Sequence, residues 1–414
     1  MKSSQDKLNE ISDIALRFRP SSNVGSGGSQ PSFTFLEFFA GGGMARAGLG
    51  PGWKCLFAND FDHKKSIAYR DNWRGDVLLT QDVHKVTTNN VTDGRADFAW
   101  ASFPCQDLSV AGMGAGLRGD RSGTFWPFWN LMLALKTERR APRVMVFENV
   151  CGTLTSHGGK DFAAIADSVT EAGYYFGAVV IDAAEFVPQS RKRLFMIAAS
   201  HEYELPHCVV SDGLETRRYP KSVWNAYNEL SVATRENWIW WNVPFQAARA
   251  TRFAELIEDE PSGVRWHTPA ETSALLAMMS RINLEKVESA KKAGRVMVGG
   301  VYRRTRRNAD GTKVQRAEVR FDDVAGCLRT STGGSSRQTI LVVEADSLRS
   351  RLISARETAR LMGLPDTYKL PSNYNEAYHL TGDGVVVPVV RHLANSVLEP
   401  LLMSLRADHQ RAIA

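Results

Sequence analysis

Short apolar runs alternate with longer helical patterns through the first half of the chain. Helical patterns occupy residues 124–138 and 160–173, and the runs around them are rich in apolar and β-prone residues. Strands that alternate with helices are typical of an α/β domain with a doubly wound, mostly parallel sheet, which we predict over residues 33–200. The predicted strands lie at 33–40, 54–58, 77–79, 97–102, 143–147, 175–181 and 194–198.

The alternation stops near residue 200. A long helical pattern follows at 269–292, and we interpret residues 201–380 as a second, smaller domain. A final amphipathic helix begins within 382–390, with Pro388 in its first turn, so the C-terminal segment is 381–414. The core of the smaller domain is predicted to contain five closely spaced tryptophans, Trp224, Trp238, Trp240, Trp241 and Trp266.

The chain of 414 residues is long for one hydrophobic core, which agrees with two packed domains. Ahead of them, residues 1–32 predict an amphipathic helix and a flexible linker rich in Ser and Gly. The five cysteines are odd in number and far apart, so their spacing indicates neither a disulfide framework nor a metal site. No apolar run has the length of a membrane span, and the N-terminus lacks the apolar core of a signal peptide. We therefore expect a cytoplasmic protein without a metal or a membrane partner.

Positive charge is concentrated in one segment. The chain has a formal net charge of +6, and residues 295–320 contain eight Lys or Arg against two acidic residues. Glycine-containing turn signals bracket the segment, so we predict a basic hairpin or loop that contacts DNA. A solvated arginine-rich surface loop is the alternative. The cluster consists of Arg303, Arg304, Arg306 and Arg307, and Thr330, Thr332 and Gly333 belong to a second loop that a phosphate backbone can approach closely.

A candidate nucleophile lies at the end of the fourth predicted strand. Pro104 ends that strand, because proline cannot donate to a β ladder, and Cys105 follows at its tip. Residues 107–123 contain five glycines and predict a mobile loop beside the thiol. Covalent chemistry by Cys105 is one interpretation, and a buried cysteine that serves as a small hydrophobic residue is the other.

The first predicted strand leads into Gly41-Gly42-Gly43, a pattern typical of a tight turn that holds a cofactor. A dinucleotide fingerprint requires a small residue at its sixth position. Counted from Gly41, that position is Arg46, which weakens the nicotinamide interpretation. Asp60 ends the next strand about 20 residues after the glycines, where a carboxylate can accept from the ribose hydroxyls of an adenosine. Asp60 fits S-adenosylmethionine as well as NAD.

Five short blocks of sequence, in the same order, resemble the DNA (cytosine-5)-methyltransferase family. The resemblance implies a Rossmann-like methyltransferase domain, a smaller DNA-recognition domain, and S-adenosylmethionine as the cofactor. The blocks are Phe-Phe-Ala-Gly-Gly-Gly at 38–43, Phe-Pro-Cys-Gln at 103–106, Glu-Asn-Val at 148–150, Gln-Ser-Arg-Lys-Arg at 189–193 and Arg-Glu-Thr-Ala-Arg-Leu-Met-Gly-Leu-Pro at 356–365.

The same resemblance implies roles for individual residues. Cys105 is the nucleophile, Glu148 bonds ring N3 of the target cytosine, and Arg193 and Arg191 contact its O2 side. The family often has Gly-Asn-Ser where this chain has Gly-Asp-Gly at 382–384, which leaves the polar contact there open. The cofactor contacts are assigned to Phe39, Ala40, Gly41, Gly43, Asp60, Phe61, Asp82, Val83, Pro104, Asp383 and Val385. Further DNA contacts are assigned to Gln106, Ser109 and Gln189.

The expected function is sequence-specific methylation of cytosine at carbon 5 in double-stranded DNA by a monomeric enzyme. It would act in a restriction-modification system or as an orphan modification enzyme. The cytosine must be extruded, because carbon 6 is stacked inside a duplex. One alternative is a tRNA cytosine-5 methyltransferase, which the long basic insertion between 200 and 340 disfavours. The other is a catalytically silent DNA-binding relative, which the intact Cys105, Glu148 and Arg193 disfavour.

Overall fold

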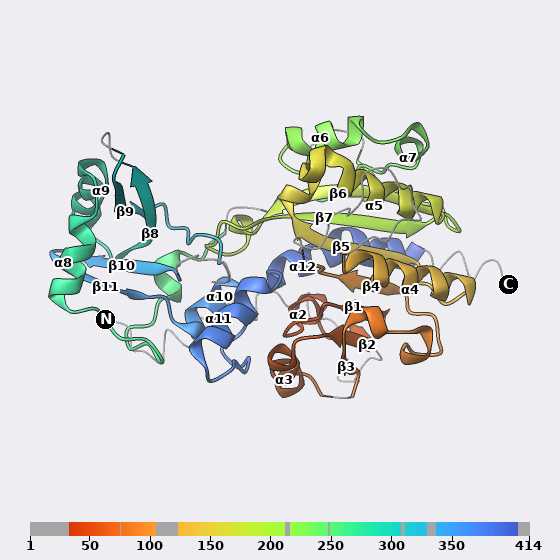
Figure 1. Ribbon diagram of the computed structural model, residues 1–414, viewed down its shortest axis with the longest axis horizontal. Helices are drawn as coiled ribbons and strands as arrows, with labels where there is room; N and C mark the ends of the chain where they lie inside the picture. Colours follow the sequence, from red (N-terminus) through yellow and green to blue (C-terminus); the bar gives the residue numbers. More distant parts are fainter. Residues whose placement is uncertain are drawn as a thin grey trace.

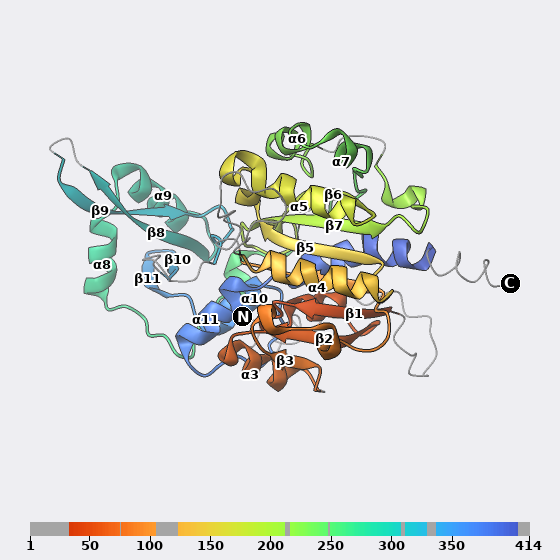
Figure 2. The same ribbon diagram turned by 45° about the vertical axis from the view of Figure 1, so that its right-hand side comes forward.

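The protein consists of a large α/β part and a smaller part built on a second sheet, with helices α10 and α11 between them (Figure 1). Figure 2 shows the β8–β9 hairpin of the smaller part extending away from the large part. The predicted helix and linker at 1–32 lie outside the described residues. The computed structural model describes residues 33–74, 76–104, 123–211, 216–246, 249–307, 311–328 and 337–404.

A seven-stranded sheet with the order β3-β2-β1-β4-β5-β7-β6 forms the large part. Only β7 runs against its neighbours, β5 and β6. This confirms the predicted doubly wound, mostly parallel α/β fold. The strand order reverses between β1 and β4, where such sheets bind ligands. The strands are β1 (Phe33–Phe38), β2 (Trp53–Asp60), β3 (Leu78–Thr80), β4 (Phe98–Ala101), β5 (Val144–Val150), β6 (Tyr174–Asp182) and β7 (Lys192–Ser200).

Helices cover this sheet over an aromatic core. The ring centroid of Phe128 on α4 lies 4.9 Å from that of Phe38 on β1 and 6.0 Å from that of Phe147 on β5. All three side chains are fully buried, so α4 fixes the two strands that flank β4. The helices of the large part are α2 (Met44–Leu49), α3 (His63–Asn72), α4 (Phe125–Thr137), α5 (Lys160–Glu171), α6 (Lys221–Asn228), α7 (Val232–Glu236) and α12 (Val387–Leu393).

The large part extends beyond the predicted boundary at residue 200. The Ile239 N–H donates to the carbonyl of Phe176 on β6 at 2.8 Å. Gly177 permits this approach, because a Cβ atom there would lie 2.0 Å from the Ile239 carbonyl oxygen. Trp238 and Trp241 are buried in the large part, and Trp224 and Trp240 pack beside them. Trp266 instead pairs with Arg351 in the smaller part. The assignment to the core of the smaller domain was therefore wrong for four of the five tryptophans.

The second sheet is antiparallel, with the order β11-β10-β8-β9, and α8 and α9 pack on one of its faces. The single helix predicted over 269–292 is two helices, because the intervening backbone bonds to the sheet. The Met278 carbonyl accepts from the Ala317 N–H at 3.0 Å. The elements are α8 (Pro269–Ala277), α9 (Arg281–Lys291), β8 (Met297–Arg307), β9 (Lys313–Arg320), β10 (Thr339–Glu344) and β11 (Ser347–Leu352).

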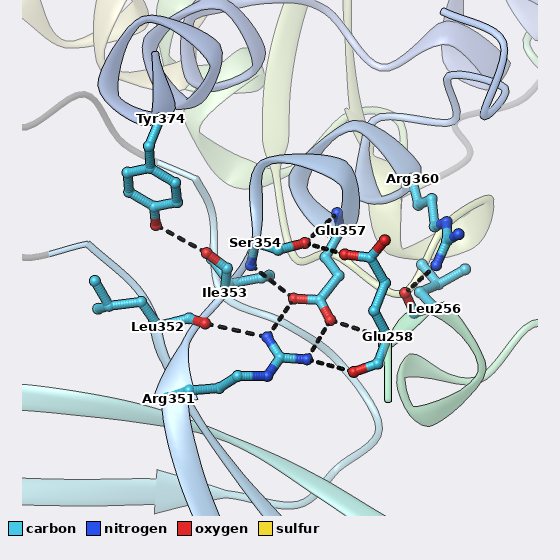
Figure 3. Close-up of polar contacts among 9 residues, drawn as sticks. All are labelled: Leu256, Glu258, Arg351, Leu352, Ile353, Ser354, Glu357, Arg360 and Tyr374. Carbon is cyan, nitrogen blue, oxygen red and sulfur yellow. Dashed lines mark hydrogen bonds and ion pairs between the residues drawn. The ribbon is translucent and has the colours of Figure 1, made fainter. Parts of the chain in front are cut away.

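A buried ion pair joins the smaller sheet to α10 (Ala355–Leu361), as Figure 3 shows. Arg351 on β11 donates to the two carboxylate oxygens of Glu357 at 2.7 and 2.5 Å, and both side chains are completely buried. Glu357 also accepts from the backbone N–H groups of Ser354 and Glu258, each at 2.7 Å. The Ser354 hydroxyl accepts from the Glu357 N–H at 3.1 Å, which confirms the predicted cap. Helix α10 was expected to be structural, and this pair anchors it.

The C-terminal segment Tyr374–Ser404 contains α11 (Tyr374–Asp383), α12 and a π-helical turn (Ala394–Leu398). By length and composition it is apolar enough to span a membrane, which differs from the expectation for the sequence. However, 61% of its most apolar window is buried, and its apolar residues belong to the core of the large sheet. This is the arrangement of a core helix in a globular protein.

The first prediction concerns the buried pair. Glu357→Gln should lower the free energy of unfolding by about 3 to 5 kcal/mol, because it leaves the Arg351 charge buried without its counter-charge. Urea denaturation followed by circular dichroism measures the change. Glu285→Gln is the control, since Glu285 pairs with Arg281 on α9 through side chains that are 61% and 92% exposed. Equal effects of the two substitutions would contradict the role given to Glu357.

Candidate active site

The chain turns sharply after β1, beside the point where the strand order reverses. Phe39 and Gly41 have φ angles of 55° and 54°, in the left-handed region that glycine tolerates best. Gly43 is tightly packed, since a Cβ atom there would lie 2.1 Å from Nε1 of Trp73. At Gly41 the same position has no described atom within 4 Å. The turn is therefore packed on its helix side and open at Gly41.

A buried polar network supports this turn. Glu37 on β1 is 1% exposed and accepts from the Arg46 N–H at 3.3 Å and from the Tyr69 hydroxyl at 3.2 Å. Burial raises the pKa of Glu37 to about 7. The Arg46 guanidinium donates to the Tyr69 hydroxyl at 3.1 Å and lies 4.9 Å from the ring centroid of Trp73. Arg46, which disfavours a dinucleotide site, thus ties α2 to α3 behind the turn.

Asp60 ends β2 next to the turn. Its carboxylate accepts from the backbone N–H groups of Gly41 at 2.7 Å and Asp62 at 2.8 Å, and burial raises its pKa. A carboxylate has about four lone-pair positions, so these two contacts leave room for ribose hydroxyls. The Phe61 side chain is 65% exposed, which leaves its ring open to an adenine. The open Gly41, the buried carboxylate and the exposed ring fit an adenosine-bearing cofactor.

The other predicted cofactor residues lie on the same edge of the sheet. Asp82 follows β3 with 55% of its side chain exposed. Asp383, at the end of α11, forms an ion pair with Lys65 on α3 at 2.6 Å. Asp383, which departs from the family pattern, therefore has its charge balanced by Lys65. Ala40 and Pro104 follow β1 and β4 closely, and Val83 and Val385 are buried.

Two neighbouring strand ends bring a carboxylate and a guanidinium together. Nε of Arg193 on β7 lies 3.2 Å from Oε1 of Glu148 on β5, with 17% and 8% of the side chains exposed. Asn149 donates to the carbonyl of Phe103 at 3.1 Å, which joins the end of β5 to the segment after β4. The predicted nucleophile Cys105 lies outside the described residues, as do Gln106 and Ser109. Glu148 and Arg193 are thus paired close to the last described residue before the cysteine, Pro104.

Gln189 and Arg191 are buried, and their polar atoms bond to the protein framework. Gln189 is completely buried, and its amide donates to the Leu361 carbonyl at 2.8 Å and accepts from the Leu328 N–H at 3.2 Å. Arg191 is 2% exposed, and its terminal nitrogens donate to the carbonyls of Leu328, Gly382 and Gly384. The polar atoms of Gln189 thus hold the framework in this structure, and its contact with DNA stays a prediction. Arg191 serves the framework as well, which leaves Arg193 as the arginine beside Glu148.

A cleft of about 1040 Å³ lies between the two parts. Its lining includes Ser190 from the large part, Tyr302 and Arg304 from β8, Arg320 from β9, and Cys327 from the connection between the parts. The predicted basic hairpin is therefore real and forms one wall of an interdomain cleft. The other predicted loop residues, Thr330, Thr332 and Gly333, lie outside the described residues.

The arginine cluster divides between two faces of the hairpin, because side chains alternate along a strand. Arg304 and Arg306 share the face of Tyr302, and both pair with Glu318, at 3.6 and 2.8 Å. Arg303 and Arg307 share the opposite face, which lower down carries residues packed on α8 and α9. Arg303 still reaches the cleft lining from that face. The four arginines therefore do not form a single patch.

Sequence reasoning missed several residues that build this site. Asn149 and Lys65 bond to partners that are 46 and 318 positions away, and Glu318 pairs with Arg306 across the hairpin. The position of Asn149 inside the Glu-Asn-Val block at 148–150 was the signal by which it could have been found. In the described ranges, no three His, Cys, Asp or Glu side chains are grouped to hold a metal ion.

The fold and the turn at its switch point define a Rossmann-like methyltransferase with a second, smaller domain. Residues 33–399 match the family model described as C-5 cytosine-specific DNA methylase. The chain belongs to this family and is a DNA (cytosine-5)-methyltransferase.

Individual proteins of known name are similar to this chain over most of its length. Type II methyltransferase M.HpaII of Haemophilus parainfluenzae is 25% identical, over 93% of either chain. Type II methyltransferase M.BsuFI of Bacillus subtilis is 25% identical over 90% of this chain and 74% of its own length. Among solved structures, the S. pombe Dnmt2 methyltransferase has a TM-score of 0.54 at 17% identity, covering 89% of this chain and 99% of that one. The Entamoeba histolytica methyltransferase EhMeth has a TM-score of 0.57 at 13% identity, covering 91% and 99%. These two structures support the fold.

The second prediction tests Asp60. Asp60→Asn should weaken binding of S-adenosylmethionine at least tenfold, since a charge-assisted hydrogen bond contributes about 1.5 to 3 kcal/mol. Affinity for the wild type should also fall as the pH falls through the raised pKa of Asp60, because the charged form accepts from the ribose. Calorimetry measures both effects. The control is Asp62→Asn, which removes a charge two residues away and keeps a good helix cap. Unchanged affinity in Asp60→Asn would refute the ribose role.

The third prediction follows from the two faces of the hairpin. Replacing Arg304 and Arg306 together by Ala should reduce the salt slope of log DNA affinity by about 1.8, because each lost phosphate contact contributes about 0.9. Replacing Arg303 and Arg307 together should give a smaller decrease. Fluorescence anisotropy at several salt concentrations measures the slope. Equal slopes for wild type and the Arg304/Arg306 variant would make that face a solvated surface.

Proposed function

We propose that this enzyme methylates carbon 5 of an extruded cytosine in double-stranded DNA, with Cys105 as a covalent nucleophile. The supporting observation is that the Glu148–Arg193 pair and the Gly41 turn with Asp60 lie at the same edge of one sheet. Strand β4, which leads to Pro104 and Cys105, runs between β1 and β5. The thiol would thus follow a strand that lies between the strands of the proposed cofactor residues and the strands of the Glu148–Arg193 pair.

S-adenosylmethionine is the proposed cofactor. Asp60 would accept from its ribose hydroxyls, Phe61 would lie against the adenine, and Asp82 would accept from the adenine amino group. When bound, it supplies a methyl group carried on a sulfonium. The open position at Gly41 and the carboxylate of Asp60 support this assignment.

In this proposal, Cys105, Glu148 and Arg193 carry out the reaction at the base. Carbon 5 of cytosine is a poor nucleophile until the Cys105 thiolate adds to carbon 6 and converts the ring to an enamine. Glu148 would bond ring N3 and Arg193 would contact O2, so that charge developing on the ring is stabilised as the bond to sulfur forms. After carbon 5 gains the methyl group it loses its proton, the bond between sulfur and carbon 6 breaks, and the thiolate returns.

The cleft supports DNA as the substrate. Arg304 lines the cleft and Arg306 shares its face of the hairpin, and their positive charge suits a phosphate backbone. Extrusion of the cytosine costs a few kcal/mol, which contacts with the rest of the duplex must offset. The relatives named Type II methyltransferases suggest a modification enzyme of the Type II kind. Methyl transfer from radiolabelled cofactor to duplex DNA, with tRNA as the competing substrate, tests the assignment. Bisulfite sequencing of DNA from an expressing host identifies the methylated site.

The fourth prediction tests the nucleophile. Fluorine at carbon 5 cannot leave as a proton does, so a duplex with 5-fluorocytosine at its target should stay joined to the enzyme through denaturing electrophoresis. Formation of this adduct should require the cofactor. Cys105→Ser should abolish it and still permit DNA binding, because a hydroxyl is far less ionised than a thiol at neutral pH.

The other cysteines provide matched controls. Single replacement of Cys55, Cys151, Cys208 or Cys327 by Ser should leave the adduct in place. Peptide mapping identifies the attached residue. An adduct that persists in Cys105→Ser, or that maps to another cysteine, rules out the proposed mechanism.

A further inference from the structure

Arg191 occupies an unusual position for a charged residue. It is 2% exposed, and its two terminal nitrogens donate to acceptors in two segments far apart in the sequence. Nη1 donates to the Leu328 carbonyl at 3.0 Å and to Sγ of Cys327 at 3.5 Å. Nη2 donates to the carbonyls of Gly382 at 2.9 Å and Gly384 at 2.7 Å. One rigid guanidinium therefore fixes the separation between residues 327–328 and residues 382–384.

The first of these segments belongs to the DNA side of the molecule. Residues 325–328 lie between β9 and β10 along the chain, and Ala325 bonds in both directions to the backbone beside Gln189 in the large part. Cys327 lines the interdomain cleft. Tyr302 of the basic hairpin packs on Gly326, where a Cβ atom would lie 2.2 Å from the Tyr302 hydroxyl. Movement of the hairpin when a duplex binds would therefore displace the groups that accept from Nη1.

The second segment belongs to the cofactor side. Gly382 and Gly384 flank Asp383, which forms the 2.6 Å ion pair with Lys65. Lys65 lies in the first turn of α3, and against the opposing effect of burial its pKa is raised by Asp383 first and then by Asp60 and Asp62. The acceptors of Nη2 are thus connected through one ion pair to the residues proposed to hold the ribose.

We propose that Arg191 is a positioning residue that couples the two binding sites, so that cofactor strengthens DNA binding and DNA strengthens cofactor binding. A guanidinium fork keeps all its bonds only when both segments are in place. In a buried position a lost bond to a charged group is costly, so ordering of one segment favours ordering of the other. This proposal rests on the proposed function, because it assumes those two ligands.

Binding measurements without turnover test the coupling. The probes are S-adenosylhomocysteine, which carries no transferable methyl group, and the duplex site identified by bisulfite sequencing. In the wild type, S-adenosylhomocysteine should tighten DNA binding at least about fivefold, and DNA should tighten S-adenosylhomocysteine binding by the same factor. Arg191→Lys keeps the charge but lacks the planar fork, so its factor should fall to about one.

Arg218→Lys is the matched control. Arg218 is also buried, and it donates to both Glu185 oxygens, at 2.6 and 2.8 Å, and to the Pro244 carbonyl, away from the two segments that Arg191 joins. This variant should keep the wild-type factor. If Arg191→Lys keeps that factor, or Arg218→Lys loses it equally, the coupling role is wrong.

Three further results would each have a different meaning. If Arg191→Lys does not fold, Lys65→Gln and Cys327→Ala test the two ends of the connection, and a wild-type factor in both would overturn the proposal. If the wild type binds both ligands with a factor of one, the proposal also fails. If the wild type binds neither ligand, the proposed function fails instead.

Discussion

A guanidinium enclosed by protein must find acceptors in its surroundings, and this requirement organises the centre of the molecule around Arg191. Burial lowers the pKa of Arg191 to about 10, which leaves it charged at neutral pH. The connection after β9 and the turn after α11 both supply carbonyls to it. Since these segments lead to the basic hairpin and to the last helix of the large part, one side chain fixes where the two parts meet.

Another buried arginine, Arg351, is satisfied differently. Arg351 is neutralised by Glu357, and the carboxylate is further satisfied by two backbone N–H groups. Such a pair holds one fixed joint, because separating the charges inside the protein is strongly unfavourable. Arg191 instead donates to neutral carbonyls from two segments, so its bonds are complete only when both segments are in place. The interdomain junction thus combines one charge-neutralised contact beside α10 with one that joins two distant segments.

The sequence was sufficient for the parts of the fold that depend on local patterns. Strand ends, the glycine turn and Asp60 follow from apolar runs and turn chemistry, and β1 to β7 lie close to the predicted positions. Trp238 and Trp241 could not be placed in this way, because their burial depends on Gly177 admitting a distant segment beside β6. The burial of Gln189 was missed for a similar reason. A glutamine in a recognised block has no local signal that distinguishes a DNA contact from a buried bond to Leu361, which is 172 residues away.

The hairpin shows why a charged run does not define a binding surface by itself. Alternation along β8 sends neighbouring arginines to opposite faces, so only pairing with β9 decides which charges act together. On the face of Tyr302, Glu318 lies between Arg304 and Arg306, and the hydrogen bond from Arg306 lowers its pKa. The carboxylate orients both arginines and, if the hairpin contacts DNA as proposed, would have to share them with a phosphate. Affinity for a polyanion would thereby be reduced, and contacts that depend on the geometry of the duplex would gain weight over attraction by charge alone.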